Sequence, residues 1–266
     1  GVDSVLNVRV KECAPFENVY TLALRGLHDR AMNASNDMGD RKDMLQEALM
    51  AQRQMLIDAI GKPGEEIPQA FTPYKEVLDV YDEGLELPDD VTIIWPDDNY
   101  GYMKRLSSPK EQKRSGRSGV YYHSSYLGKP HDHLWMNTVS PTLMYEELRK
   151  AYDATADRIW LLNAGDIKSC EFAVDYFLTM AFDIDAFNFE RAANYRTEWL
   201  CGMLGDQYRN EYQDVVNSFY KLAFARKPEF MGWGYQWTTD KHGRERNTDT
   251  DFSLTNYREV DNRLSE

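Results

Sequence analysis

Carboxylate side chains stand at the ends of three separate apolar runs of the sequence. Asp29 and Glu76 follow two of these runs within a few residues, and Asp97 lies at the end of the third. A single acid after a strand is a common turn or cap residue, so none of the three is informative alone. Hydrolysis of a glycosidic bond uses two carboxyl groups, one acting as acid and one as base. The recurrence of the pattern therefore predicts this kind of chemistry.

Two basic residues accompany these acids. Arg25 precedes Asp29 by four positions, and Lys75 directly precedes Glu76. Each could serve only as a counter-charge for the neighbouring acid. An arginine guanidinium also binds a carboxylate through two parallel hydrogen bonds, and this reading predicts an acidic sugar as the ligand. Further polar side chains at the ends of apolar runs, which we predict to bind the substrate, are Asn99, His123, Tyr126 and Asn163.

Two other classes of function use the same residues. A metal-dependent hydrolase could employ His123, His131 and His133 with the Asp97 and Asp98 pair, because alternate histidines of a strand can share a metal ion. No compact set of further ligands stands beside the two neighbouring histidines, so we predict neither a metal nor another cofactor. A carbohydrate-binding protein without catalytic activity could keep the aromatic and amide groups. Both classes remain alternatives to a glycosidase.

Short apolar runs alternate with helix-like stretches from Val19 to about Asp183, a pattern typical of parallel βα units. Two of the helices have clear ends: 41–61 stops at Gly61, and 140–154 begins at Ser140 as N-cap. The predicted strands cover residues 19–26, 67–73, 91–98, 119–126 and 158–166.

Every predicted strand delivers polar side chains at its C-terminal end. In a (β/α)8 barrel these ends meet at one mouth, where the active site is built from several strands. We therefore expect an α/β fold in which residues 1–183 form the last five βα units of a TIM-type barrel, with earlier strands preceding residue 1. Residues 184–227 read as amphipathic helices, and the polar stretch 238–266 reads as a loop leading into a further helix. We expect residues 184–266 to form a helical bundle domain that is incomplete in this sequence.

Composition narrows the classes of partner. The chain has 266 residues and a formal net charge of −13, which disfavours a nucleic acid, because affinity for phosphates comes largely from lysine and arginine. No apolar stretch of about 18 residues is present, so we expect no membrane span. The sequence starts without a methionine and shows no signal peptide, and localisation must be inferred from function.

The run from Trp95 to Thr138 and the segment "LLNAGDIKSCE" resemble glycoside hydrolase family 115, the xylan α-1,2-glucuronidases. The earlier blocks "LALRGLHD" and "TPYKEVLDVYDEG" are similar to the same family, and the resemblance covers about residues 1–200. It implies removal of (4-O-methyl)glucuronic acid from glucuronoxylan or xylo-oligosaccharides with inversion at the anomeric carbon. It also implies a secreted or periplasmic protein, and a homodimer through the helical domain is an open expectation.

By this resemblance the active-site positions coincide with the strand ends. We predict Glu76 as general acid, Asp29 as general base and Asp97 as the group that holds the attacking water or a sugar hydroxyl. Inversion requires the acid and base to lie about 6.5–9.5 Å apart. The positions that the resemblance assigns to substrate binding are Arg25, Lys75, Asn99, His123, Tyr126 and Asn163.

Overall fold

The computed structural model describes residues 2–26, 31–32, 37–125, 134–225, 227, 237–239 and 245–247. The chain divides into two compact units, and each is described by itself. The first consists of residues 1–96, 103–121 and 151–161. The second consists of residues 97–102, 122–150 and 162–266.

Five strands form one curled parallel sheet, which has the form of half a barrel. Along the chain they are β1 (Tyr20–Thr21), β2 (Gln69–Phe71), β3 (Thr92–Pro96), β4 (Ser118–His123) and β5 (Trp160–Asn163), and they lie in the sheet in the same order. Ala70 pairs with Thr92, and Ile94 pairs with Gly119. The predicted α/β fold with five strands in sequence order is confirmed.

Each strand is shorter than its predicted segment. Residues 97 and 98 were predicted to continue β3, but the strand ends at Pro96. Residues 22–26 likewise follow β1 as irregular backbone. After β3 and β5 the predicted segments included polar residues whose side chains accept N–H groups of the nearby backbone, as Asp97, Asp98 and Asn163 do.

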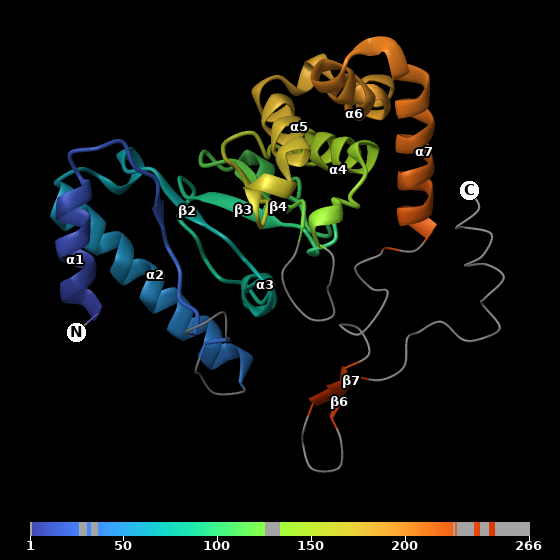
Figure 1. Ribbon diagram of the computed structural model, residues 1–266. Coiled ribbons are helices and arrows are strands. Elements are labelled where there is room, and N and C mark those ends of the chain that lie inside the picture. Colours follow the sequence, from blue (N-terminus) through green and yellow to red (C-terminus); the bar gives the residue numbers. More distant parts are fainter. Residues whose placement is uncertain are drawn as a thin grey trace. The chain divides into compact units, whose positions relative to one another are not determined.

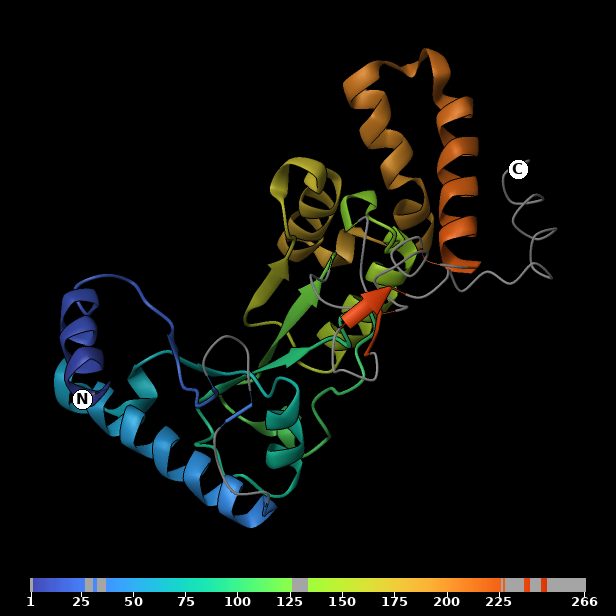
Figure 2. The ribbon, with the colours of Figure 1, turned by 60° about the horizontal axis from the view of Figure 1, so that its bottom comes forward.

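Three helices belong to the first unit: α1 (Val2–Cys13), α2 (Met38–Ile60) and α3 (Glu76–Asp82). In both Figure 1 and Figure 2, α1 lies beside α2. The core of this unit lies between α2, α3 and the first strands. Its fully buried side chains include Leu22, Leu45, Leu49, Phe71, Val80 and Val91.

The ends of α2 agree with the signals in the sequence. Gly61 adopts the left-handed conformation with a φ of 73°, and its N–H donates to the carbonyl of Ile57 at 2.8 Å. A residue without a Cβ is favoured there, so the helix stops where it was predicted to stop. The helix begins at Met38, three residues earlier than predicted, because the Asp37 side chain accepts the Asp40 N–H and caps it.

Helices of the second unit are α4 (Pro141–Asp153), α5 (Glu171–Phe182), α6 (Phe189–Leu204) and α7 (Arg209–Ala225). Ser140 caps α4 as predicted, since its Oγ accepts the Leu143 N–H at 3.2 Å. Figure 2 shows α6 and α7 side by side. Aromatic rings fill the space between α5 and α6, where the ring centroids of Tyr176 and Tyr195 lie 4.9 Å apart.

The described residues after Asp183 are helical through Ala225, as the sequence predicted. The short strands β6 (Trp237–Thr239) and β7 (Glu245–Asn247) then pair antiparallel, whereas the sequence predicted no strand after residue 183. A domain boundary between residues 183 and 184 stays a prediction. Among the described helices, none combines the length and the apolar character that a bilayer crossing requires.

Candidate active site

In the first unit, the side chains of Arg25 and Glu76 form a bidentate ion pair. Arg25 Nε and Nη2 donate to the two carboxylate oxygens of Glu76, each at 3.1 Å. Arg25 follows β1, and Glu76 is the first residue of α3, directly after β2. Both side chains are about four-fifths buried, with 21% and 19% exposure. Such a geometry suits an ionised carboxylate, because both oxygens act as acceptors.

Tyr74 lies beneath both cations of this cluster. Its ring centroid is 5.4 Å from Cζ of Arg25 and 5.1 Å from Nζ of Lys75. The ring of Tyr121, on β4, meets that of Tyr74 edge-on at 6.0 Å. Cation–π attraction favours both positive groups over the same ring. The cluster of Arg25, Tyr74, Lys75 and Glu76, which we call the cation cluster, therefore carries one more positive than negative charge.

The backbone of Lys75 is strained. Its φ is 52° and its ψ is −124°, a conformation that L-residues other than glycine rarely adopt. The strained residue, Lys75, lies between Tyr74, whose ring faces the cations, and Glu76, the first residue of α3. Local strain at such a point fixes the directions of three successive functional side chains.

A hydrogen-bond network supports α3 from its far end. The Glu111 carboxylate accepts hydrogen bonds from Arg105 at 2.9 and 3.0 Å, and from the Tyr81 hydroxyl of α3 at 2.7 Å. The guanidinium of Arg105 also covers the Trp95 ring at 4.6 Å. Burial by itself opposes ionisation of Glu111, but hydrogen bonds from Arg105, the Ser108 N–H and Tyr81 lower its pKa to about 2.

In the second unit, Asp97 and His123 form a buried pair. Asp97 Oδ1 lies 2.6 Å from His123 Nδ1, and Asp97 Oδ2 accepts the His123 backbone N–H at 3.0 Å. The Asn99 N–H donates to Asp97 Oδ1 at 3.0 Å. The side chains of Asp97 and His123 are 0% and 1% exposed. The described contacts of Asp97 are those of a group that orients His123, and its predicted role towards water or a sugar hydroxyl stays a prediction.

The residues after Asp97 form a closed turn. Asp98 donates its N–H to the Tyr102 carbonyl at 2.9 Å, and its side chain accepts the N–H groups of Tyr100 and Tyr102. Asn99 has a φ of 71°, which asparagine tolerates better than most residues. The Tyr122 hydroxyl donates to the Gly101 carbonyl at 2.9 Å, and a Cβ at Gly101 would lie 2.8 Å from that hydroxyl.

Asn163 ends β5 and lies beside the end of β4. Its carbonyl accepts the Ser124 N–H at 3.0 Å, and its Oδ1 accepts the Gly165 N–H at 3.4 Å. Asn163 as a whole residue is partly exposed. Substrate binding by Asn163 stays a prediction.

The structure thus brings the predicted residues into two clusters, one in each unit. The first joins Arg25, Lys75 and Glu76, and the second joins Asp97, Asn99 and His123. Asp29 and Tyr126 lie outside the described residues, so the roles predicted for them stay predictions.

Sequence reasoning missed Tyr74 and Tyr121. The signal that could have identified Tyr74 is its place directly before Lys75 and Glu76 at the end of a strand. For Tyr121 the signal is the alternation of side chains along β4: residues two positions apart point to the same face, so Tyr121 lies on the same face as His123.

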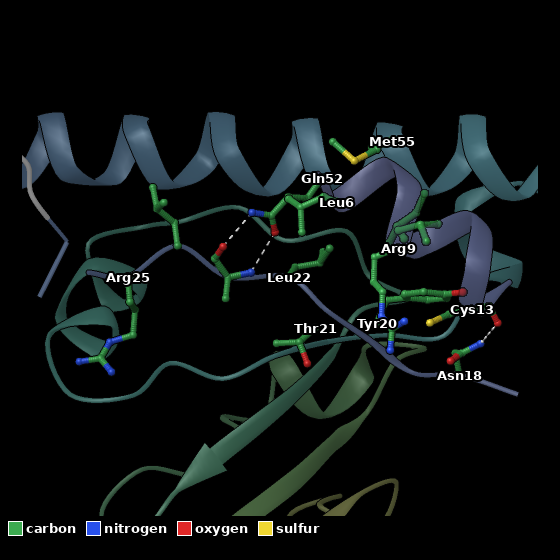
Figure 3. A pocket seen from close by; sticks show the side chains of 14 residues that line it. Leu6, Arg9, Cys13, Asn18, Tyr20, Thr21, Leu22, Arg25, Gln52 and Met55 are labelled. Carbon is green, nitrogen blue, oxygen red and sulfur yellow. Dashed lines mark hydrogen bonds between the residues drawn. The ribbon is translucent and has the colours of Figure 1, made fainter. Parts of the chain in front are cut away.

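A pocket of about 450 Å³ lies between α1, α2 and the segment after β1. Figure 3 shows Arg25 at one end of it and Cys13 with Asn18 at the other. The Gln52 side chain bonds both the N–H and the carbonyl of Ala23, at 3.0 and 2.8 Å. The wall is mostly apolar, so it does not match the hydroxyl groups of a sugar, and the pocket borders the cation cluster only through Arg25.

Within the described residues, no group of three or more histidine, cysteine or acidic side chains is arranged to hold a metal ion. His131 and His133, which the metal alternative needs, lie outside those residues.

Comparisons with known proteins give one consistent result. The family model of glycosyl hydrolase family 115 matches residues 1–230. Among solved structures, the chain is similar to a family 115 4-O-methyl-α-glucuronidase with specificity for decorated arabinogalactans, with 40% identity and a TM-score of 0.88. The match covers 99% of this chain but 34% of that protein, so the chain spans about a third of its length. The search of curated proteins returns no match.

Proposed function

The chain belongs to glycoside hydrolase family 115. We therefore propose that the protein is a glycosidase that removes α-linked (4-O-methyl)glucuronic acid from the side chains of a plant polysaccharide. The similar structure is a 4-O-methyl-α-glucuronidase, and this supports the proposal that the released sugar is (4-O-methyl)glucuronic acid. We further propose that the five-stranded sheet is the C-terminal part of a (β/α)8 barrel and that the helices from α6 onward belong to a helical domain.

The cation cluster is the observation that carries the choice of an acidic sugar. Arg25 and Lys75 both lie over the ring of Tyr74, and Arg25 is paired with the carboxylate of Glu76. The chain as a whole has a net charge of −13, so a local excess of positive charge stands out. A uronate carboxylate complements this excess, whereas a neutral sugar does not.

The mechanism that we propose is inversion by two carboxyl groups. Glu76 donates a proton to the leaving oxygen, and Asp29 activates water on the opposite face of the sugar. The pair of Asp97 and His123 supports the reaction by holding the imidazole in one orientation, with Nδ1 directed at the carboxylate. Measurement of the anomer released first, by NMR, tests inversion directly.

For the polymer, we propose glucuronoxylan, and decorated arabinogalactan is the second candidate because the similar structure has that specificity. The experiment is to incubate the protein with each polymer and to identify the released sugar by chromatography. Release of glucuronic acid or its 4-O-methyl ether from either polymer supports the proposal. Binding to both polymers without any released sugar would instead favour a carbohydrate-binding protein.

Chelation separates the glycosidase from the metal-dependent alternative. Full activity after exhaustive treatment with a chelator is expected, because the proposed mechanism uses carboxyl groups alone. Since the polymers are extracellular, we also propose that the protein acts outside the cytoplasm, in the periplasm or in the medium. Fractionation of the producing cells tests this location.

A further inference from the structure

Glu76, which we propose as the proton donor, forms an ion pair with Arg25 in this structure. Glu76 must carry a proton to act as general acid, yet both of its oxygens accept N–H groups of Arg25. Protonation would remove the negative charge of Glu76, and with it the charge-assisted character of both hydrogen bonds from Arg25. The same arginine is the residue predicted to bind the carboxylate of the substrate. The proposed mechanism thus requires the Arg25 guanidinium to pair with two carboxylates, that of Glu76 and that of the substrate.

We propose that Arg25 is exchanged between the two carboxylates. Without substrate it holds Glu76; when a uronate binds, it turns to the uronate carboxylate, and Glu76 takes up a proton from the solvent. The step balances, because one bidentate ion pair replaces another and one proton moves from buffer to a carboxylate oxygen. This inference rests on the proposed function and explains how that site would select its substrate.

Physical arguments favour exchange over binding side by side. Two carboxylates that share one guanidinium repel each other, and such a pair is relieved when one of them becomes neutral. Lys75 directly precedes Glu76 in the chain, and Asp79 lies one turn further along α3. Lys75 keeps a cation beside the bound uronate, over the ring of Tyr74.

The ring of Tyr74 lets Arg25 change partners without leaving the cluster. Arg25 Cζ lies over this ring at 5.4 Å, and Tyr121 holds the ring from its edge. A guanidinium can rotate in its plane above an aromatic ring while the cation–π contact persists. Glu76 becomes a proton donor only when a negatively charged sugar occupies Arg25. Neutral glycosides would bind without activating it.

Calorimetric titration tests the exchange. Glucuronic acid is titrated into the protein at pH 6.5 in two buffers with different ionisation enthalpies, with glucose as the neutral ligand. We expect net uptake of protons when glucuronate binds, and none when glucose is added. Binding of glucuronate without proton uptake would overturn the exchange while leaving the proposed function intact. Absence of glucuronate binding would overturn both.

Glu76→Gln supplies the second arm. The amide cannot take up the proton, so the uptake should vanish, and it competes less well for Arg25, so glucuronate should bind at least about threefold tighter. The matched control is Glu198→Gln, which removes a carboxylate that pairs with Arg209 on the second unit. This control should leave both the affinity and the proton uptake unchanged. Equal proton uptake by Glu76→Gln and wild type would also refute the exchange.

Discussion

Asp97 Oδ1 lies 2.6 Å from Nδ1 of His123, and neither side chain is more than 1% exposed. The carboxylate also accepts the backbone N–H groups of His123 and Asn99. Three donors therefore converge on one buried carboxylate. These contacts connect the residue after β3, Asp97, with the last residue of β4, His123. Buried charges of this kind stabilise a structure only when all of their partners are present.

Asp97→Asn should cost both stability and activity. The amide nitrogen of asparagine is a donor, so it must face at least one of the donors that now bond to the carboxylate. We expect a loss of about 1–3 kcal/mol in the free energy of unfolding and at least about tenfold in kcat. Urea denaturation and release of uronic acid measure the two effects. An equally stable and active variant would show that the pair does not orient His123.

Lys75→Gly should be more stable than Lys75→Ala. Both variants lose the amine, but only glycine adopts a φ of 52° with a ψ of −124° at little cost. We expect the glycine variant to be about 1 kcal/mol more stable, because strain in such a conformation costs of order 1–3 kcal/mol. Thermal denaturation of the two variants gives the difference. Equal melting temperatures would mean that the backbone of Lys75 is unstrained.

The network around Glu111 should weaken in acid. Hydrogen bonds from Arg105 and its neighbours lower the pKa of Glu111 to about 2, below its ordinary value of 4.5. A carboxylate with a lowered pKa stabilises the fold above about pH 4.5, and its contribution is lost as the pH falls towards about 2. Glu111→Gln should therefore be clearly less stable than wild type at pH 7, and this difference should shrink at pH 3. Urea denaturation at the two pH values, with Glu86→Gln as an exposed control, makes the comparison; a constant difference would contradict it.

Arg25→Ala should impair the reaction on charged substrates above all. Loss of a charged hydrogen bond costs roughly 1.5–3 kcal/mol, so kcat/KM on glucuronoxylan should fall at least about tenfold. On the carboxyl-reduced polymer the fall should be smaller, because that substrate has no carboxylate for Arg25 to bind. Arg209→Ala, which removes an exposed ion pair between the start of α7 and Glu198 of α6, is the control for general effects on stability. An equal fall on both polymers would mean that Arg25 serves only to neutralise Glu76.

Local patterns were enough to predict several features of the fold. The apolar runs predicted five parallel strands in their correct order, since strands buried on both faces have few polar residues. Gly61 predicted the end of α2, and Ser140 predicted the beginning of α4. The motifs at the strand ends predicted the family, which the match over residues 1–230 confirms. These features depend on near neighbours in the chain, and a sequence displays near neighbours directly.

The partners of the charged residues depended on the tertiary structure. Arg25 stands four residues before Asp29 in the sequence, but it bonds Glu76, 51 positions away. Asp97 was predicted to hold water or a sugar hydroxyl, which stays a prediction, and only the structure shows that it accepts hydrogen bonds from His123 and Asn99. Strand register and the unusual backbone of Lys75 set these directions, and neither follows from local propensity. The amino-acid sequence by itself determined which functional groups the strands deliver; only the folded chain decided which of them neutralise one another, because that choice depends on distances between residues remote in sequence.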